Sequence, residues 1–387
     1  MKQLSVLLLM LFFVFPSMAQ DRLAITHGPW LQHLTDDEVT IVWTTNTNAV
    51  SWVELAPDDG THFYLKERPK FFSAEYGFKD VGRMHSVRLS GLKPATKYRY
   101  RIYSTEVLKH EGTNVQYGTT ASTSVYQRKP LEFTTVNPQQ EKVSFLIVND
   151  IHGRNDLLEN LLQKGEYKSS DFIFFNGDMV NDIRNEEQLF SDFLDTSIRL
   201  FASEKPIYYA RGNHETRGNF ANEFPRYFPS PSNKLYYLLR QGPVCFVVLD
   251  CGEDKPDSDI EYSGIVAFDQ YRALQLEWLR EAVKHPAFTE APMKVAVIHM
   301  PPFGGWYGEE QVKDMYIPVL NEAGIQVMFC GHLHRHVFQQ PQGAFKFPVV
   351  ANTNTSVIRA EASAEGMQVK IINEKGEVSA SFEISPK

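Results

Sequence analysis

Cysteine is scarce in this sequence, with three in 387 residues: Cys245, Cys251 and Cys330. Three cysteines cannot all pair within one chain, which excludes a scaffold held together mainly by disulfides. Cys245 and Cys251 stand at the two ends of the apolar run 246–250. A strand of that length, at about 3.3 Å per residue, separates them by roughly 20 Å, too far for a disulfide. We therefore expect three buried free thiols.

Basic runs and long apolar runs are also missing. The net charge is −8 with histidine neutral, which argues against nucleic acid as a partner. The apolar run 4–15 has about 12 residues, short of the roughly 20 that span a membrane. With Lys2 before it and Ser17-Met18-Ala19 after it, this run predicts a signal peptide over residues 1–19. We expect no transmembrane segment and export to the periplasm or the outside, while the oligomeric state stays open.

The length of the chain suggests two or more domains. Residues 20–137 contain short alternating or β-branched runs separated by turn residues, at 39–43, 51–55, 83–89, 97–103 and 131–135, which predict an all-β sandwich. Residues 142–387 alternate strand-like runs with helical periodicity at 156–162, 186–201 and 269–283, which predicts an α/β domain. A hairpin of 368–372 and 378–384 closes it. Trp30, Trp43 and Trp52 are predicted as core residues, in preference to a carbohydrate-binding surface.

Five polar motifs each follow an apolar run in the second domain. The runs are 142–148, 171–175, 206–210, 293–298 and 325–330, and they read as strands buried on both faces. Because ligands in α/β sheets collect at the carboxyl ends of strands, we expect the motifs to meet. Their Asp, Asn and His side chains form the mixed oxygen and imidazole set that suits two divalent cations. The motifs are Asp150-Ile151-His152, Gly177-Asp178, Gly212-Asn213-His214-Glu215, His299 and Gly331-His332-Leu333-His334.

The spacing within the motifs supports a shared site. Asp150 and His152 are two residues apart, as are His332 and His334, and in an extended segment such pairs point to the same face. Glycines at 153, 177, 212 and 331 permit sharp turns and close approach. A single histidine at a strand end is more often structural than a ligand. All five motifs in this order favour a metal centre.

This order of motifs resembles the calcineurin-like metallophosphoesterases, over about residues 142–350. The segments 28–31 and 85–101 resemble a fibronectin type III module, and together the two regions look like the purple acid phosphatase branch. The resemblance implies a fibronectin-like β-sandwich followed by an α/β metallophosphoesterase domain. In that domain two mixed sheets are flanked by helices, and the ligands stand at strand C-terminal ends.

The resemblance also implies a ligand set. The first metal would be held by Asp150, His152, Asp178 and His334, and the second by Asp178, Asn213, His299 and His332. Asp178 would bridge the two ions. His214 would stand beside the metals as an electrostatic clamp or a proton donor, and Glu215 could orient its imidazole.

One position departs from the purple acid phosphatase pattern. That branch has a tyrosine three residues after the bridging aspartate, where this chain has Asn181, and His152 takes the place of the missing ligand. We therefore expect a colourless protein that accepts Mn, Zn or Fe. In the loop after His299, Trp306 or Tyr307 could stack on a leaving group, although both could equally pack the loop down.

The expected reaction is hydrolysis of a phosphate ester by a metal-bound hydroxide, with no protein nucleophile. A small phosphomonoester is the favoured substrate, and a nucleotide, lipid or envelope phosphodiester is the alternative. An inactive extracellular binding or adhesion protein is a less favoured hypothesis, because none of the seven ligand positions is vacant. A nuclease is disfavoured because the chain lacks a basic groove.

Overall fold

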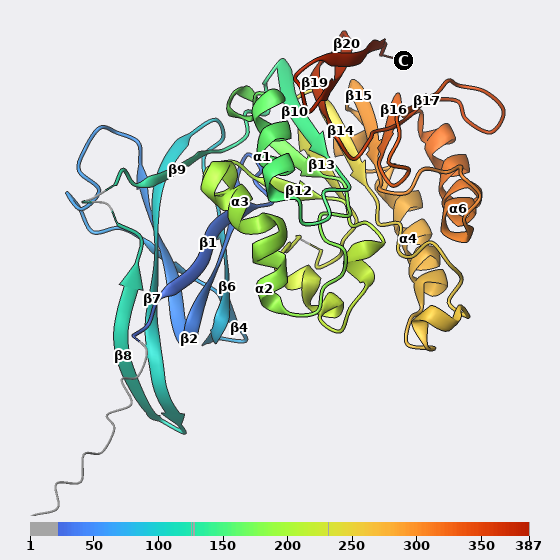
Figure 1. Cartoon of the computed structure of the whole chain (residues 1–387). Helices are drawn as coiled ribbons and strands as arrows, with labels where there is room; N and C mark the ends of the chain where they lie inside the picture. The colour runs from blue at the N-terminus through green and yellow to red at the C-terminus, as the bar shows by residue number, and fades with distance from the viewer. Residues whose placement is uncertain (1–21, 125, 127, 231, 387) are drawn as a thin grey trace, which may run out of the picture.

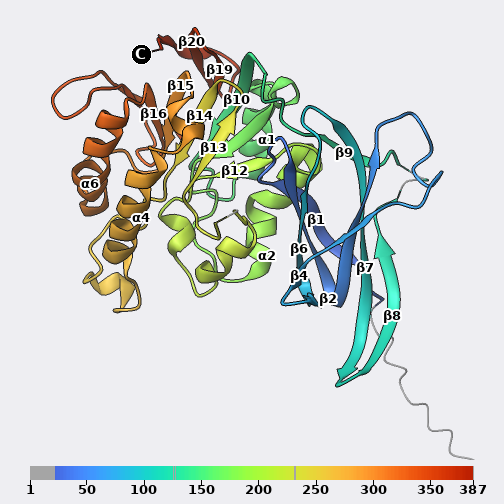
Figure 2. The same ribbon diagram turned by 180° about the vertical axis from the view of Figure 1, so that it is seen from behind.

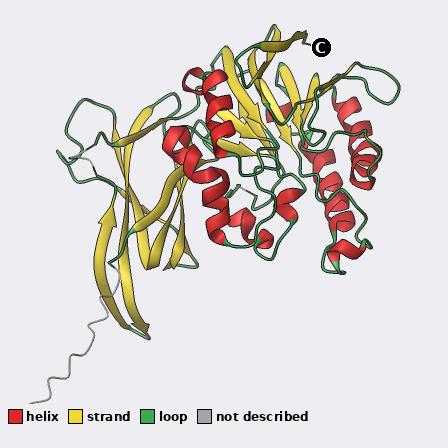
Figure 3. Ribbon diagram, in the orientation of Figure 1, coloured by secondary structure: helices red, strands yellow, loops and turns green. Residues whose placement is uncertain are grey.

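The computed structural model describes residues 22–124, 126, 128–230 and 232–386, so the predicted signal peptide lies outside the described residues. The molecule has two lobes (Figure 1). One lobe consists of strands, and in the other, helices flank β-sheets (Figure 3). In the part of the chain that the structure describes, no helix is long and apolar enough to cross a membrane.

The N-terminal lobe is a β structure built around one long strand. Two of its predicted strands, 39–43 and 51–55, are wrong as separate elements because both belong to β2. The first part of β2 pairs with β1 and β6, and the second part pairs with β3 and β7, with a register shift between Thr44 and Ala49. The strands are β1 Ile25–Gln32, β2 Glu38–Pro57, β3 Lys70–Phe72, β4 Ala74–Glu75, β5 Phe78–Lys79, β6 Val81–Ser90, β7 Lys97–Glu111, β8 Asn114–Ser122 and β9 Leu131–Thr134.

The tryptophans of this lobe are packed as predicted at two of three positions. Trp43 is fully buried in the core of the lobe. Trp30 is also fully buried, but it packs into the core of the second lobe. Trp52 is half-buried and stacks on Tyr103 with ring centroids 5.0 Å apart.

Polar contacts fix the two lobes to each other. Trp30 Nε1 donates to the carbonyl of Tyr227 over 3.0 Å, and Tyr208 donates to the carbonyl of Leu34 over 2.7 Å. The ring of His27 stacks on Phe190 at 3.7 Å. Because apolar packing accompanies these bonds, the N-terminal lobe supports the outer layer of the second lobe.

Two six-stranded mixed sheets form the second lobe (Figure 2), in the orders β12-β11-β10-β19-β20-β21 and β13-β14-β15-β16-β18-β17. The strands are β10 Lys142–Val148, β11 Phe172–Phe175, β12 Ile207–Tyr209, β13 Tyr237–Gln241, β14 Val244–Val248, β15 Met293–Val297, β16 Val327–Cys330, β17 Val337–Gln339, β18 Val349–Ala351, β19 Ser356–Ser363, β20 Gly366–Asn373 and β21 Val378–Ile384. All five strands predicted before the motifs are present, and so is the closing hairpin β20–β21.

The sheets pack face to face between two helical layers. Along β10, Phe145 and Ile147 enter the core between the sheets, while Leu146 and Val148 face the helices, as the two-residue period of a strand requires. The helices and turns are α1 Asn155–Lys164, η1 Tyr167–Ser169, α2 Glu186–Leu189, η2 Phe190–Leu194, α3 Asp195–Ser197, η3 Ile198–Ala202, η4 His214–Thr216, η5 Ala221–Arg226, η6 Ile260–Tyr262, α4 Phe268–Ala282, α5 Pro286–Thr289 and α6 Tyr307–Ala323.

Parallel pairing directs the motif-bearing ends to one edge. Strands β10, β11 and β12 are parallel in the first sheet, and β15 and β16 are parallel in the second. The residues that follow these five strands therefore leave the sheets on the same side.

The three cysteines lie buried and free in the second lobe, as expected.

Candidate metal centre

The five motifs converge into clusters of potential metal ligands. Asp150, His152 and His334 form one group, and Asp178, His299 and His332 form another, with the ligand atoms of each group within 4.8 Å of one another. These groups coincide with parts of the two predicted ligand sets. A third group joins His152, Asp178 and His214, which places Asp178 between the other two.

The first cluster brings two imidazoles against one carboxylate. His334 Nε2 lies 3.1 Å from Asp150 Oδ1 and 3.3 Å from His152 Nε2. Burial opposes the charged form of Asp150, but His299 and His334 outweigh it and lower the pKa of that carboxyl. The hydrogen bond that His334 donates to Asp150 raises the pKa of His334. Negative charge in this cluster therefore favours a cation.

In the second cluster, backbone contacts aim the imidazoles. His299 Nδ1 donates to the carbonyl of Asn176 over 2.7 Å, which turns Nε2 to within 3.0 Å of Asp178 Oδ2. His332 Nδ1 lies 3.2 Å from Asn213 Oδ1. Burial acts to lower the pKa of His299, but Asp178 and Asp150 outweigh it and raise that pKa to about 10. Burial, reinforced by His299, lowers the pKa of His332 to about 4.

The residues fit a pair of bound cations. Asp150 and Asp178 are both buried, and two carboxylates out of water require positive charge nearby. Asp150 Oδ1 and His299 Nε2 are buried and, despite close contacts with His334 and Asp178, lack a hydrogen bond of good geometry, which is rare for buried polar atoms. Carboxylate oxygen, amide oxygen and imidazole nitrogen form a donor set that suits Mn, Zn or Fe.

The backbone of the ligand turns is not extended, contrary to our expectation for the paired ligands. Asp150 and His152 have φ values of 54° and 52°, and His332 and His334 have 71° and 53°. The strands end at Val148 and Cys330, so the pairs lie in tight turns, where left-handed residues cost about 1–3 kcal/mol each. The pairs still converge, but by left-handed turns and not by strand alternation.

Two glycines in these turns allow close approach between motifs. A Cβ on Gly212 would lie 2.2 Å from Asp178 Oδ1, and a Cβ on Gly177 would lie 2.5 Å from His299 Nδ1. Gly177 also has a φ of 80°, which favours glycine. Any larger residue at either position would push a predicted ligand out of place.

Glu215 does not orient His214, so that expectation is wrong. Its carboxylate is fully buried. A buried carboxylate needs donors, and here they come from the turns: Glu215 accepts hydrogen bonds of 2.7–2.9 Å from four donors, namely the backbone N–H groups of Asp178, Met179 and Gly212 and the hydroxyl of Tyr209. Glu215 therefore ties the turn after β11 to the turn after β12.

Asn181 and Arg217 contact the imidazole of His214 instead. His214 Nδ1 lies 2.7 Å from the carbonyl oxygen of Asn181, and because a carbonyl only accepts, Nδ1 is the donor. His214 Nε2 lies 3.2 Å from Arg217 Nη1 and 3.9 Å from Asp178 Oδ2. Asn181 thus contacts the candidate site through its backbone carbonyl.

Trp306 and Tyr307, the two aromatic residues predicted to lie near the substrate, differ in their surroundings. The Tyr307 ring lies under the guanidinium of Arg272 at 5.8 Å, and its hydroxyl interacts with Asp269, which together with burial raises the pKa of Tyr307. Tyr307 thus packs against α4, as the alternative interpretation of the loop predicts. Trp306 is 51% exposed, and its stacking on a leaving group stays a prediction.

Sequence reasoning missed several residues that support the ligands. Asn149 donates to Asp150 Oδ2 over 2.6 Å, and Asn176 donates to the carbonyls of Ile298 and Phe329. The fully buried Glu309 of α6 has Oε1 3.7 Å from His332 Nε2, and burial raises its pKa to about 7. Asn149 and Asn176 directly precede motifs, a signal that could have found them.

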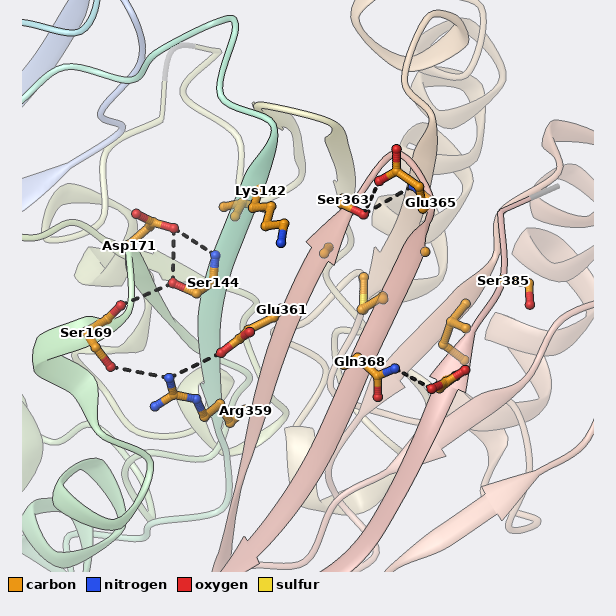
Figure 4. A pocket seen from close by; sticks show the side chains of 16 residues that line it. Lys142, Ser144, Ser169, Asp171, Arg359, Glu361, Ser363, Glu365, Gln368 and Ser385 are labelled. Carbon is orange, nitrogen blue, oxygen red and sulfur yellow. Dashed lines mark hydrogen bonds and ion pairs between the residues drawn. The ribbon is translucent and has the colours of Figure 1, made fainter.

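The hollow in Figure 4 is a different place in the molecule. It has a volume of about 470 Å³ and lies beside Lys142 and Ser144 at the start of β10, whereas Asp150 follows the end of that strand. Its polar side chains satisfy one another: Asp171 accepts from Ser144, and Arg359 contacts Glu361. The predicted ligands lie at the opposite end of the sheet.

Known proteins share both regions of this chain. Residues 143–336, half of its length, match the family described as calcineurin-like phosphoesterase. The chain belongs to this family. Residues 29–135 match the N-terminal domain of purple acid phosphatases. Both matches confirm the resemblance found in the motifs, and the histidine and aspartate clusters fit the dinuclear centre of the family.

Purple acid phosphatases are its relatives in sequence and in structure. Purple acid phosphatase 21 of Arabidopsis thaliana is 23% identical, covering 78% of this chain and 63% of that protein, and purple acid phosphatase 15 is 24% identical, covering 66% and 49%. The chain thus spans less than two thirds of the length of these relatives. The purple acid phosphatase PPD1 of yellow lupin (Lupinus luteus) superposes with a TM-score of 0.64 at 16% identity, over 92% of this chain and 74% of that one. This match confirms a β-rich lobe followed by an α/β lobe.

Proposed function

We propose that this phosphoesterase hydrolyses phosphomonoesters at a centre of two divalent metal ions. The observation that carries the proposal is the pair of neighbouring ligand clusters, linked by a third group in which Asp178 of the second cluster lies beside His152 of the first. The first ion would be held by Asp150, His152, Asp178 and His334, and the second by Asp178, Asn213, His299 and His332. Mn, Zn or Fe suits these donors.

When bound, two such ions would supply positive charge for a phosphate group. They would also lower the pKa of water so that it can lose a proton and attack phosphorus near neutral pH. The chain itself positions and shields the reacting groups. Asp178 neutralises part of the metal charge, and the Asn176 carbonyl fixes the ring of His299. Asn181 accepts a hydrogen bond from Nδ1 of His214, so Nε2 is turned towards Arg217 and Asp178, where a protonated ring would stabilise or protonate the leaving oxygen.

The remaining expectations belong to the same proposal. The protein is exported by the signal peptide 1–19, with a β-rich domain over residues 20–137 and the phosphoesterase domain over 142–387. A small phosphate ester is its partner, and nucleic acid is not. The phosphomonoester is favoured because the N-terminal match is to the phosphatase branch, and the phosphodiester is the alternative.

Hydrolysis of p-nitrophenyl phosphate and bis-p-nitrophenyl phosphate by Mn-loaded and Zn-loaded protein tests the proposal, with Asp178→Asn beside the wild type. We expect faster monoester cleavage. We also expect Asp178→Asn to lose both metal and activity, by about 100-fold or more, because one change weakens both ions. Faster diester cleavage would favour the alternative, and full activity of Asp178→Asn would contradict the metal assignment.

A further inference from the structure

Arg217 presents one edge of its guanidinium to the candidate site. The opposite edge is held by Glu253: Arg217 Nε lies 3.0 Å from Glu253 Oε1, and Nη2 lies 3.0 Å from Glu253 Oε2. This bidentate hydrogen bonding fixes the plane of the Arg217 guanidinium. The remaining nitrogen, Nη1, lies 3.2 Å from His214 Nε2. Nothing in the sequence motifs pointed to this residue.

The support behind Arg217 is built and buried. Glu253 is 1% exposed and also accepts hydrogen bonds from Thr216 Oγ1 at 2.6 Å and Tyr262 Oη at 3.0 Å. Asp254 Oδ2 adds a weaker contact at 3.4 Å from Arg217 Nη2. By contrast, about one third of the Arg217 side chain is exposed. An exposed cation on a buried rigid support is poised to meet a ligand.

Arg217 Nη1 is placed where it could donate a hydrogen bond to the substrate phosphate. His214 Nε2 is 3.2 Å from Arg217 Nη1 and 3.9 Å from Asp178 Oδ2, so Nη1 is near a predicted metal ligand. Nη1 has N–H groups to donate and no acceptor role, so a phosphate oxygen beside His214 is a natural partner. A phosphomonoester has three terminal oxygens and a diester has two. A donor in addition to the metals therefore favours the monoester.

We propose that Arg217 determines substrate specificity, donating from Nη1 to a terminal phosphate oxygen so that phosphomonoesters are preferred over diesters. This inference rests on the proposed function. The competing explanation is that Arg217 only ties the loop of Glu253 to the turn of His214. That structural role would affect folding and both substrates alike, without any preference for the terminal phosphate.

Inorganic phosphate binding to the Mn-loaded protein separates these explanations. Isothermal titration calorimetry on Arg217→Gln should show affinity for phosphate about 10- to 100-fold weaker than in the wild type, the usual effect of losing a hydrogen bond to a charged group. KM for p-nitrophenyl phosphate should rise by a similar factor. KM for the diester should rise less, so the monoester-to-diester ratio of kcat/KM falls, while metal content is retained.

Arg217→Gln leaves Glu253 buried without its partner and could unfold the loop, so the double variant Arg217→Gln/Glu253→Gln is tested beside it. Arg226→Gln is the matched control, because it removes the same charge from an arginine whose side chain is 64% exposed. Unchanged phosphate affinity in the folded double variant, or equal loss of both substrates, overturns the inference. If the wild type cleaves neither ester, the proposed function fails, and calorimetry still decides the role of Arg217.

Discussion

At the scale of the residue, His214 differs from its neighbour Asn213 in what its side chain contacts. Asn213 beside it faces His332 at 3.2 Å, whereas the ring of His214 is held by the carbonyl of Asn181 and by Arg217. One turn therefore carries a predicted ligand and, next to it, the residue that we propose to act on the leaving group. The two should respond differently to substitution.

His214→Ala should leave the metal content intact and slow the chemical step by about 100- to 10,000-fold, the usual size of a general acid–base contribution. The measurement is metal analysis of the purified variant together with kcat for p-nitrophenyl phosphate. Asn213→Ala is the comparison, for which we expect loss of metal. A His214→Ala protein that has lost an ion would make His214 a ligand, as its proximity to His152 and Asp178 permits.

At the scale of the element, the sequence predicts what depends on local pattern. Each of the five strands before a motif was predictable because an apolar run of that length is buried on both faces, and the ligands follow directly. Arg217 and Glu309 were not predictable, because their roles arise from contacts with residues 36 and 23 positions away, Glu253 and His332. The division of residues 186–202 into α-helical and π-helical segments also could not be predicted, because the apolar periodicity of this region is that of one helix.

Glu215 joins two of these elements, and its loss should loosen the site. In Glu215→Gln an amide NH₂ group would replace one acceptor oxygen and would face backbone N–H donors, which leaves at least one of them unpaired at a cost of about 1–3 kcal/mol. We expect a lower Tm and weaker metal binding, measured by thermal unfolding and metal titration. Glu223→Gln, on the surface, is the control. An unchanged Tm in Glu215→Gln would show that the two turns hold together without the carboxylate.

At the scale of the whole molecule, stability should depend on pH through the N-terminal lobe. Burial lowers the pKa of His85 from 6.5 to about 4, and burial with the help of Arg88 lowers the pKa of His33 to about 4. Because the unfolded chain takes up these protons first, the stabilising contribution is complete above pH 6.5 and falls as the pH drops towards 4. Each shift corresponds to at most about 3 kcal/mol.

This lobe packs Trp30 into the core of the phosphoesterase lobe, so acid destabilisation of the β structure should reach the metal site. We expect the urea midpoint of tryptophan fluorescence to fall between pH 7 and pH 4.5. His85→Gln keeps a partner for Thr45, which now lies 2.9 Å from His85 Nε2, and should flatten this dependence. His110→Gln, at an exposed position, should not. An equal slope in wild type and His85→Gln would show that His85 does not cause the acid sensitivity, and would leave His33 of the same lobe or the carboxylates and histidines of the candidate metal centre as its source.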